Sequence, residues 1–159
     1  MSSIVPPRPR HVGVSKRIFP IVASQFNAEY VQGLVNHATE EIRDLAPNAQ
    51  VTLHQVPGAF EIPVIVRELA VQKRADAIIA VGVIIRGSTA HADHLATSVT
   101  NALQQLAIEH GVPIVNAVLS VENEEQARER CLEERINRGT EAARAAIQIA
   151  NAMHEVRAN

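Results

Sequence analysis

The chain has 159 residues, of which 20% are charged, and 15 Lys and Arg against 17 Asp and Glu give a formal net charge of −2. This length suits one domain with a hydrophobic core, so we predict a single domain over residues 1–159. The charge balance excludes a strong positive field, and we therefore expect neither a nucleic-acid partner nor a membrane partner.

The cysteine content and the apolar runs predict a cytoplasmic protein. The single cysteine, Cys131, lies in a charged run and excludes an intrachain disulfide. The first residues lack the apolar segment of a signal peptide, and no later apolar run reaches the roughly 20 residues that span a bilayer. Residues 1–12 contain Pro6, Pro7 and Pro9, which predicts a flexible N-terminal arm.

The first regular segments alternate between strand and helix patterns. Residues 17–24, "RIFPIVAS", are almost continuously apolar and predict a buried strand, although Pro20 lacks a ladder donor and argues against a central position. Apolar residues follow the helical period from 29 to 45, and "QVTLHQV" (50–56) alternates like a strand. After the turn "PGAF", we expect a helix over 61–73.

The alternation continues in the second half of the chain. "ADAIIAVGV" (75–83) predicts a buried strand, and a helix is expected over 90–110, ending at Gly111. "PIVNAVLSV" (113–121) predicts a fourth strand.

Two helices are expected to complete the chain. Asn123 followed by Gln126 resembles a capping box that opens a short helix to about Cys131. Gly139 leads into an alanine-rich helix ending near His154. Four alternations of strand and helix predict an α/β fold in which a parallel sheet lies between helix layers.

Polar or unusual residues follow every predicted strand. In a parallel α/β sheet, ligands bind beyond the carboxyl ends of the strands, which all lie on one edge. The segments at this edge are "SQFN" (24–27), "PGAFE" (57–61), "IIRGSTAH" (84–91) and "SVEN" (120–123). The sequence therefore predicts one site at this edge.

The segment "RGSTAH" could bind an anion such as phosphate. Gly87 permits unusual backbone angles, and Ser88 and Thr89 bring hydroxyls and backbone donors to a helix N-terminus. The same residues also fit an ordinary strand-to-helix turn with a Ser or Thr cap. The segment lacks the Gly-Lys-Ser/Thr ending of a Walker loop.

His91, in the first turn of that helix, could exchange protons near neutral pH, with Asp93 or His94 tuning it. The alternative is a surface or capping histidine. The other histidines show no metal-ligand spacing, and His91 with His94 lacks a third ligand, so we expect no metal.

Aromatic residues are scarce, with three Phe, one Tyr and no Trp, so those in polar loops are informative. Phe26 is expected to cover either the core or a flat ligand. Phe60 and Glu61 follow a glycine turn, where backbone donors could meet a planar ligand and Glu61 could accept hydrogen bonds from hydroxyls. A hydrophobic staple with an acidic residue at a helix N-terminus is the alternative.

The motifs "FN", "VPGAFEIP", "GVIIRGSTAH" and "ENEEQARER", in this order and spacing, resemble the 6,7-dimethyl-8-ribityllumazine synthase family over roughly residues 17–153. The resemblance implies a flavodoxin-like, three-layer α/β/α sandwich with a four-stranded parallel sheet. It also implies the penultimate step of riboflavin biosynthesis, the condensation of 5-amino-6-(D-ribitylamino)uracil with 3,4-dihydroxy-2-butanone 4-phosphate. That reaction gives 6,7-dimethyl-8-ribityllumazine, phosphate and water, and uses no metal or redox cofactor.

The resemblance also implies roles for individual residues. His91 would shuttle protons, and Phe26 would stack on the pyrimidine with Asn27 beside it. The other implied substrate-binding residues are Ala59, Phe60 and Glu61 near the ribityl chain, Val83, Ile84 and Ile85 along the ring, Ser88 and Thr89 at the phosphate, Asn116 and Arg130 from the adjacent subunit, and Arg138 where the family usually has lysine. A homo-oligomer built on pentamers is implied, with riboflavin synthase as a candidate partner.

Three departures from the family pattern bear on affinity and assembly. Asn116 and Ala92 stand where the family often has aromatic residues, which predicts weaker binding of substrate or product. "CLEERINRG" (131–139) lacks the frequent glycine-rich form, and the prolines of the arm disfavour an added strand. Both features favour pentamers or paired pentamers over a sixty-subunit shell.

Two other functions compete with the enzyme. A flavin- or lumazine-binding or shell-forming paralogue with little turnover is suggested by Asn116 and Ala92, whereas retained His91 and Arg130 favour catalysis. A flavodoxin-like carrier is disfavoured because "SQFNAEY" after the first strand has no cluster of Gly or Thr.

Overall fold

The computed structural model describes residues 3–9 and 16–159. Its elements are β1 (Ile18–Ser24), α1 (Ala28–Leu45), β2 (Gln50–Val56), the short 3-10 helix η1 (Ala59–Glu61), α2 (Ile62–Val71), β3 (Ile78–Ile85), α3 (His91–His110), β4 (Ile114–Val121), α4 (Glu124–Cys131) and α5 (Arg138–Ala158). Every predicted strand and helix is present. The third strand lies two to three residues later than expected, and α5 begins one residue earlier and extends four residues beyond His154.

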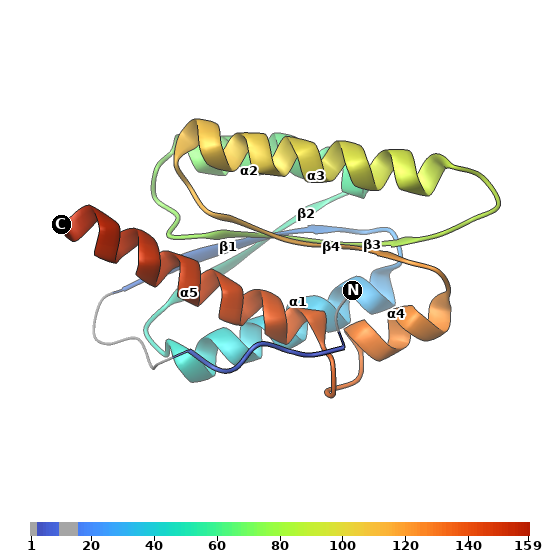
Figure 1. Cartoon of the computed structure of the whole chain (residues 1–159), viewed down its shortest axis with the longest axis horizontal. Helices are drawn as coiled ribbons and strands as arrows, with labels where there is room; N and C mark the ends of the chain where they lie inside the picture. The colour runs from blue at the N-terminus through green and yellow to red at the C-terminus, as the bar shows by residue number, and fades with distance from the viewer. Residues whose placement is uncertain (1–2, 10–15) are drawn as a thin grey trace.

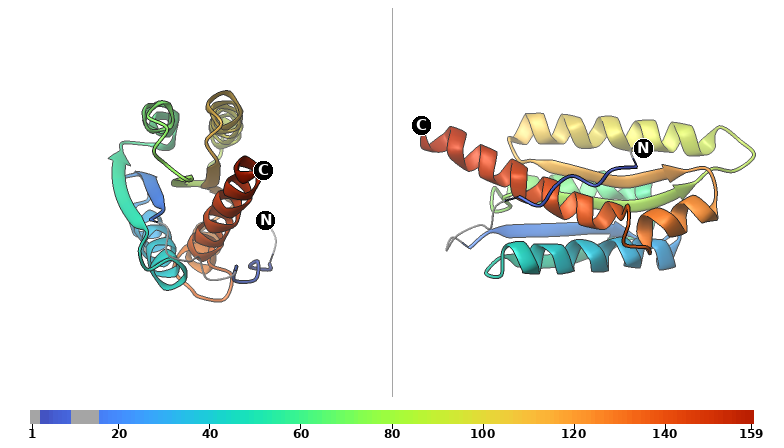
Figure 2. Two further views of the ribbon diagram at one scale, coloured as in Figure 1. Left: turned by 90° about the vertical axis from the view of Figure 1, so that its left-hand side faces the viewer. Right: turned by 60° about the horizontal axis from the view of Figure 1, so that its bottom comes forward.

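The four strands form one parallel sheet in the order β2–β1–β3–β4. In Figures 1 and 2, α2 and α3 cover one face of this sheet, and α1, α4 and α5 lie on the other. The predicted three-layer α/β/α sandwich with a flavodoxin-like fold is therefore confirmed.

Strand alternation explains the continuous apolar runs of β1 and β3. Ile21 and Ala23 of β1 belong to the core under α1 and α5, whereas Val22 between them belongs to the core under α2 and α3. β3 divides in the same way, with Ile79 in one core and Ala80 in the other. Both strands are buried on two faces, so nearly every position is apolar.

The expectation that Pro20 argues against a central strand is wrong, because β1 lies between β2 and β3. The Ile18 N–H donates to Asp76 Oδ2 at 2.8 Å on the β3 side. Pro20, two residues later, faces the same side, but the register with β3 begins only at Ile21. The missing N–H of Pro20 therefore lies before the ladder that it would have interrupted.

Residues 3–9 of the predicted arm lie against α1 and α5 of the same chain. Arg8 Nε is 2.7 Å from Glu41 Oε1, and Arg144 Nη1 donates to the Pro6 carbonyl oxygen at 2.6 Å. Residues 1–2 and 10–12 of the arm are outside the described residues, so its flexibility stays a prediction. In the described ranges, no helix combines the length and apolar character needed to cross a bilayer.

Candidate functional site

The carboxyl ends of all four strands lie together, on the right-hand side of Figure 1. The chain passes from β1 outward to β2 and then back across β1 to β3, so the connection reverses direction between β1 and β3. Ligands of doubly wound sheets bind at such a reversal. A cavity of about 410 Å³ opens there, and we call it the rim cavity.

The rim cavity gathers most of the predicted site residues. Those that line it are Phe26, Asn27, Ala59, Phe60, Glu61, Val83, Ile84, Ile85 and His91. The lining also includes three residues that the sequence analysis did not single out, Ser24, Gly58 and Leu95. Leu95 lies one helical turn after His91, so the helical spacing of α3 was a usable signal for it.

Phe26 does not cover the core, because 72% of its surface is exposed at the cavity. A Cβ at Gly58 would lie 3.4 Å from Phe26 Cδ2 and 3.3 Å from Glu61 Oε2, so the ring and the carboxylate both rest against this glycine. Phe60 is 70% exposed on the same lining. Of the two expectations for Phe26, a ligand-facing ring fits this exposure.

His91 is the first residue of α3 and lines the rim cavity. Its backbone N–H donates to Thr89 Oγ1 at 3.4 Å. Asp93, a predicted tuning group, instead places Oδ2 2.7 Å from Arg86 Nη2. The Asp93 carboxylate is therefore engaged by Arg86.

The loop between β3 and α3, residues 86–90, is held by ion pairs at the surface. Arg86 pairs with Asp93 and also with Glu122 Oε1 at 3.0 Å. The hydrogen bond with Asp93, followed by that with Glu122, raises the pKa of the Arg86 guanidinium above its ordinary value. Ser88 and Thr89 are exposed and lie outside the rim cavity lining.

The expected use of unusual backbone angles at Gly87 is wrong. Among the described glycines, the one with positive φ is Gly111 at the end of α3, with φ 63°. A Cβ at Gly87 would meet no described atom within 4 Å. The loop is open at this point, so no close approach requires glycine.

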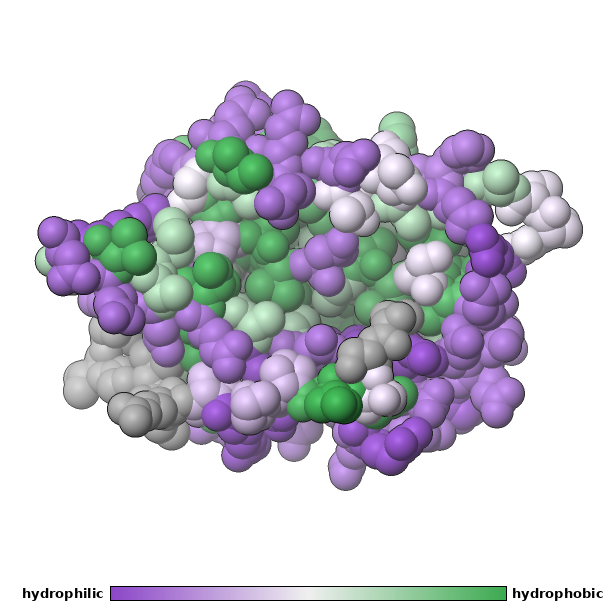
Figure 3. All heavy atoms as spheres, viewed as in Figure 1, coloured by the Kyte–Doolittle hydropathy of each residue, from purple (hydrophilic) through white to green (hydrophobic). Residues whose placement is uncertain are grey.

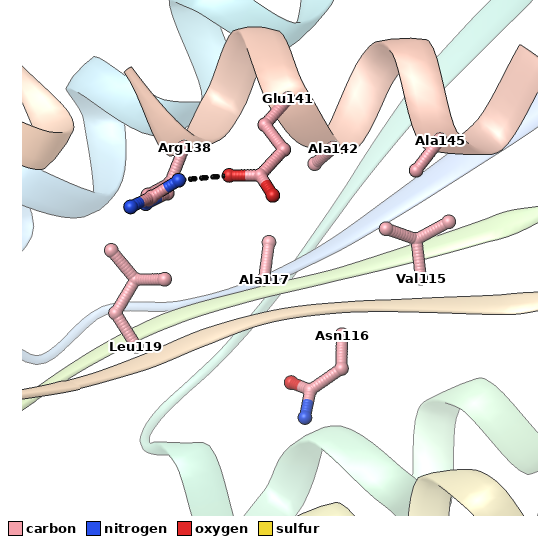
Figure 4. Close-up of a pocket in the computed structure, with 8 residues that line it drawn as sticks. All are labelled: Val115, Asn116, Ala117, Leu119, Arg138, Glu141, Ala142 and Ala145. Carbon is pink, nitrogen blue, oxygen red and sulfur yellow. Dashed lines mark hydrogen bonds and ion pairs between the residues drawn. The ribbon is translucent and has the colours of Figure 1, made fainter. Parts of the chain in front are cut away.

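A second cavity of about 350 Å³ lies between β4 and α5, and we call it the β4 cavity. Figure 4 shows its lining: Val115, Asn116, Ala117, Leu119, Arg138, Glu141, Ala142 and Ala145. The Arg138 guanidinium pairs with Glu141. Its Nε and Nη2 are buried and have no hydrogen-bond partner among the described residues. The β4 cavity therefore contains a cation with unused donors.

Asn116 and Arg130 also lie away from the rim cavity. The Asn116 side chain projects from the face of β4 opposite Arg138 (Figure 4), and its Nδ2 donates to Thr100 Oγ1 on α3 at 3.3 Å. Arg130 on α4 is only 15% exposed, and its Nη1 is 3.4 Å from Glu129 Oε2. Its buried Nε has no partner in the described part of the chain.

An apolar hollow runs over β4 between α3 and α5. Figure 3, drawn in the orientation of Figure 1, shows hydrophobic residues inside this hollow and hydrophilic residues around it. Its floor includes the side of β4 that lines the β4 cavity, Val115, Ala117 and Leu119. Within this floor Val115 is partly buried, whereas Ala117 and Leu119 are buried in the core under α1 and α5.

Asn137 organises the loop between α4 and α5. Its Oδ1 accepts from the Gly139 N–H at 2.9 Å, and its Nδ2 donates to the Cys131 carbonyl at 3.0 Å.

Burial raises the pKa of the Cys131 thiol to about 12, so the thiol stays protonated at neutral pH. Ala92 is buried in the core under α2 and α3 and does not line the rim cavity.

The described residues contain no group of side chains arranged as metal ligands. Within residues 3–9 and 16–159, no three His, Cys, Asp or Glu side chains come together in a way that could hold a metal ion. The polar groups of the rim cavity are suited instead to proton transfer and hydrogen bonding.

Comparison with known proteins identifies one family. Residues 16–154 match the model of the family described as 6,7-dimethyl-8-ribityllumazine synthase. A protein of that name from Aquifex aeolicus is 43% identical over 140 residues, covering 87% of this chain and 91% of the relative. Relatives of the same name from Chloroherpeton thalassium and Chlorobium limicola are 42% and 40% identical, each covering 84% of this chain and 86% of the relative.

Proposed function

The chain belongs to the 6,7-dimethyl-8-ribityllumazine synthase family, and we propose that it condenses 5-amino-6-(D-ribitylamino)uracil with 3,4-dihydroxy-2-butanone 4-phosphate. The products are 6,7-dimethyl-8-ribityllumazine, phosphate and water. The observation that carries this proposal is the rim cavity, where an exposed aromatic ring, a carboxylate and a histidine meet at the sheet's reversal point.

The aminouracil binds in the rim cavity. Phe26 offers a flat face for the pyrimidine, and Val83, Ile84 and Ile85 line the side formed by β3. Glu61 accepts hydrogen bonds from the ribityl hydroxyls, with Ala59 and Phe60 beside it. Holding two reactants in one cavity is worth up to roughly 7 to 11 kcal/mol in the best intramolecular cases.

His91 handles the protons. Imine formation, phosphate elimination and ring closure each move a proton, and an imidazole can both accept and donate one near neutral pH. Since His91 lines the same cavity as Phe26 and Glu61, one group can serve all three steps. A binding protein without turnover has no need of it.

Phosphate is held by groups from two subunits. Ser88 and Thr89 lie beside His91 in one chain, and Arg130 and Arg138 come from the neighbour. The supporting observation is that the rim cavity has no arginine in its lining, whereas Arg138 in the β4 cavity has buried donors without partners among the described residues. Cationic donors stabilise the charge that develops on the leaving phosphate.

A ring of subunits joins the two cavities. An interface that pairs one chain's rim cavity with the next chain's β4 cavity is heterologous, and such an interface forms a ring when the rotation between neighbours closes. The apolar hollow over β4 supports this arrangement, because a neighbour would cover it. Following the family resemblance, the ring is a pentamer, either single or paired, and riboflavin synthase is a candidate partner.

Analytical ultracentrifugation tests the assembly. Pentamers or decamers are expected, because residues 3–9 lie on their own chain and the prolines deprive an added strand of donors. A megadalton shell would refute the small assembly, and an active monomer would refute the shared site.

Purified protein incubated with both substrates tests the reaction, with lumazine absorbance as the readout. Product formation that depends on both substrates supports the proposal. Tight lumazine binding without product, even at high protein concentration, would support a binding or shell-forming paralogue instead.

A further inference from the structure

Asn27 occupies a backbone conformation that few residues other than glycine adopt. Its φ of 56° and ψ of 48° lie in the left-handed region, where Asn is enriched. Asn27 is also the N-cap of α1, and its carbonyl oxygen accepts from the Tyr30 and Val31 N–H groups, each at 3.1 Å. In the described chain its side chain makes no capping hydrogen bond, so the amide serves another purpose.

The Asn27 amide bonds to the neighbouring strand. Its Nδ2 donates to the Val83 carbonyl oxygen at 2.7 Å. Backbone groups along a strand alternate in direction, and the Ile78 N–H points to β4, where it donates to the Pro113 carbonyl. Val83, five residues later, therefore presents its carbonyl to the β1 side. The β1–β3 register ends at Ala23 opposite Val81, so the amide extends the ladder where β1 leaves it.

The other end of the same loop is tied to β2. The Gln25 N–H donates to the Val56 carbonyl at 2.9 Å and to the Pro57 carbonyl at 3.2 Å. Phe26 thus lies between two attachments, one to each strand that flanks β1. Its ring is largely exposed, so these attachments and the contact with Gly58 decide where it lies.

We infer that Asn27 is a positioning residue, whose hydrogen bond to Val83 ties the loop to β3 and so holds Phe26 at the rim cavity. This inference rests on the proposed function and adds a positioning role to the substrate-binding role implied by family resemblance. The bond to Val83 uses one of the two Nδ2 hydrogens, so it is compatible with a substrate contact through the rest of the amide.

Two variants separate the side-chain bond from the backbone conformation. Asn27→Asp keeps the shape but cannot donate to Val83, and Asn27→Gly keeps the left-handed backbone without an amide. Both are expected to raise KM for the aminouracil by about tenfold, because the loop loses its attachment to β3 and Phe26 is no longer held in place. The kcat should change by less than about threefold, since His91 is untouched.

Asn36→Asp is the matched control, because the side chain of this exposed asparagine of α1 accepts from the exposed Gln32 Nε2, at 2.7 Å, and does not line the rim cavity. The Asn36→Asp variant should keep the wild-type KM and kcat. Thermal midpoints show whether each variant folds. If Asn27→Asp does not fold, the KM of Asn27→Gly decides the question. A wild-type KM in Asn27→Gly would overturn the inference, because backbone conformation alone would then suffice.

A double-mutant cycle with Phe26→Leu tests whether Asn27 acts through the ring. Once the ring is gone, Asn27→Gly should add little further loss of affinity for the aminouracil. Fully multiplicative losses would mean that Asn27 acts on the substrate without Phe26, which would overturn the inference. If the wild-type protein forms no product, the proposed function fails, and titration with 6,7-dimethyl-8-ribityllumazine runs the same cycle on binding.

Discussion

The rim cavity and the β4 cavity are built from different chemistry. The rim cavity combines exposed aromatic rings with His91 and Glu61, and its lining holds no Arg or Lys. The β4 cavity is lined mainly by aliphatic residues around Arg138, two of whose buried nitrogens have no partner among the described residues. Each cavity has what the other lacks for a reaction between a flat ring and a phosphate ester.

The two cavities also differ in how their key side chains are held. Phe26 is fixed by backbone and amide hydrogen bonds to two strands. Arg138 is fixed by close packing, because a Cβ at Gly139 would overlap the Leu34 carbonyl oxygen of α1. Between them, residues 86–90 depend on exposed ion pairs. Under the proposed function, ring binding is thus preorganised within one chain, and a second chain would complete anion binding.

Of the substitutions considered, His91→Ala is expected to have the largest effect on activity. Loss of general acid–base help should lower kcat by roughly 10² to 10⁴-fold, whereas affinity for a substrate analogue changes little. His94→Ala is the control, since His94 does not line the rim cavity. A drop in affinity with unchanged kcat would assign His91 to binding.

Mixing two inactive variants tests whether the cavities act together. His91→Ala and Arg138→Ala, produced in the same cells, should regain activity that neither shows alone. On random mixing, about a quarter of the heterologous interfaces pair an intact rim cavity with an intact β4 cavity. Steady-state rates of the mixed and the single-variant proteins provide the measurement. No recovery in assembled mixed oligomers would mean that the cavities do not share a reaction.

The sequence was sufficient to predict the rim cavity because strand ends determine it. Apolar runs located the four strands, and parallel order brought Phe26, Glu61 and His91 to one edge. The sequence could not predict contacts between residues that are distant along the chain. Nothing local to Asn27 indicates that its amide reaches Val83, because that bond depends on where β1 leaves the ladder.

Other errors arose from local rules that the tertiary structure overrides. Pro20 was expected to lie away from the sheet centre, yet the ladder with β3 starts after it. Gly87 was expected to need special angles, yet its loop is open to solvent. Alternation along β4 did carry a usable signal, since Asn116 lies between Val115 and Ala117 and must face the opposite side.

Replacing Asn116 by Phe should add a second aromatic face, contributed by the adjacent subunit, for the ligand in the rim cavity. An aromatic pair adds roughly 0.5 to 1.5 kcal/mol beyond burial, so affinity for 6,7-dimethyl-8-ribityllumazine should rise about 2- to 10-fold. Asn116 is exposed, so the larger ring need not displace core residues. Asn116→Leu separates stacking from apolar contact in the same titration. Equal or weaker binding for Asn116→Phe would mean that β4 does not face the ligand.

Replacing Arg86 by Gln should have the smallest effect of these substitutions, because Arg86 lies in the exposed loop between β3 and α3. Arg86 links Asp93 of α3 to Glu122 after β4, and all three side chains are about half exposed. Exposed ion pairs contribute little and are screened by salt, so KM for the butanone phosphate should rise by no more than about threefold at low salt.

The difference between Arg86→Gln and the wild type should shrink as ionic strength rises, because salt weakens the same pairs in the wild-type loop. Arg67→Gln is the matched control, since Arg67 makes a comparable surface pair with Glu68 on α2. The measurement is a salt series of KM for each protein. A salt-independent loss comparable to that of His91→Ala would mean that Arg86 contacts the phosphate itself, and the loop would then supply its own cation instead of relying on the neighbour's Arg130 and Arg138.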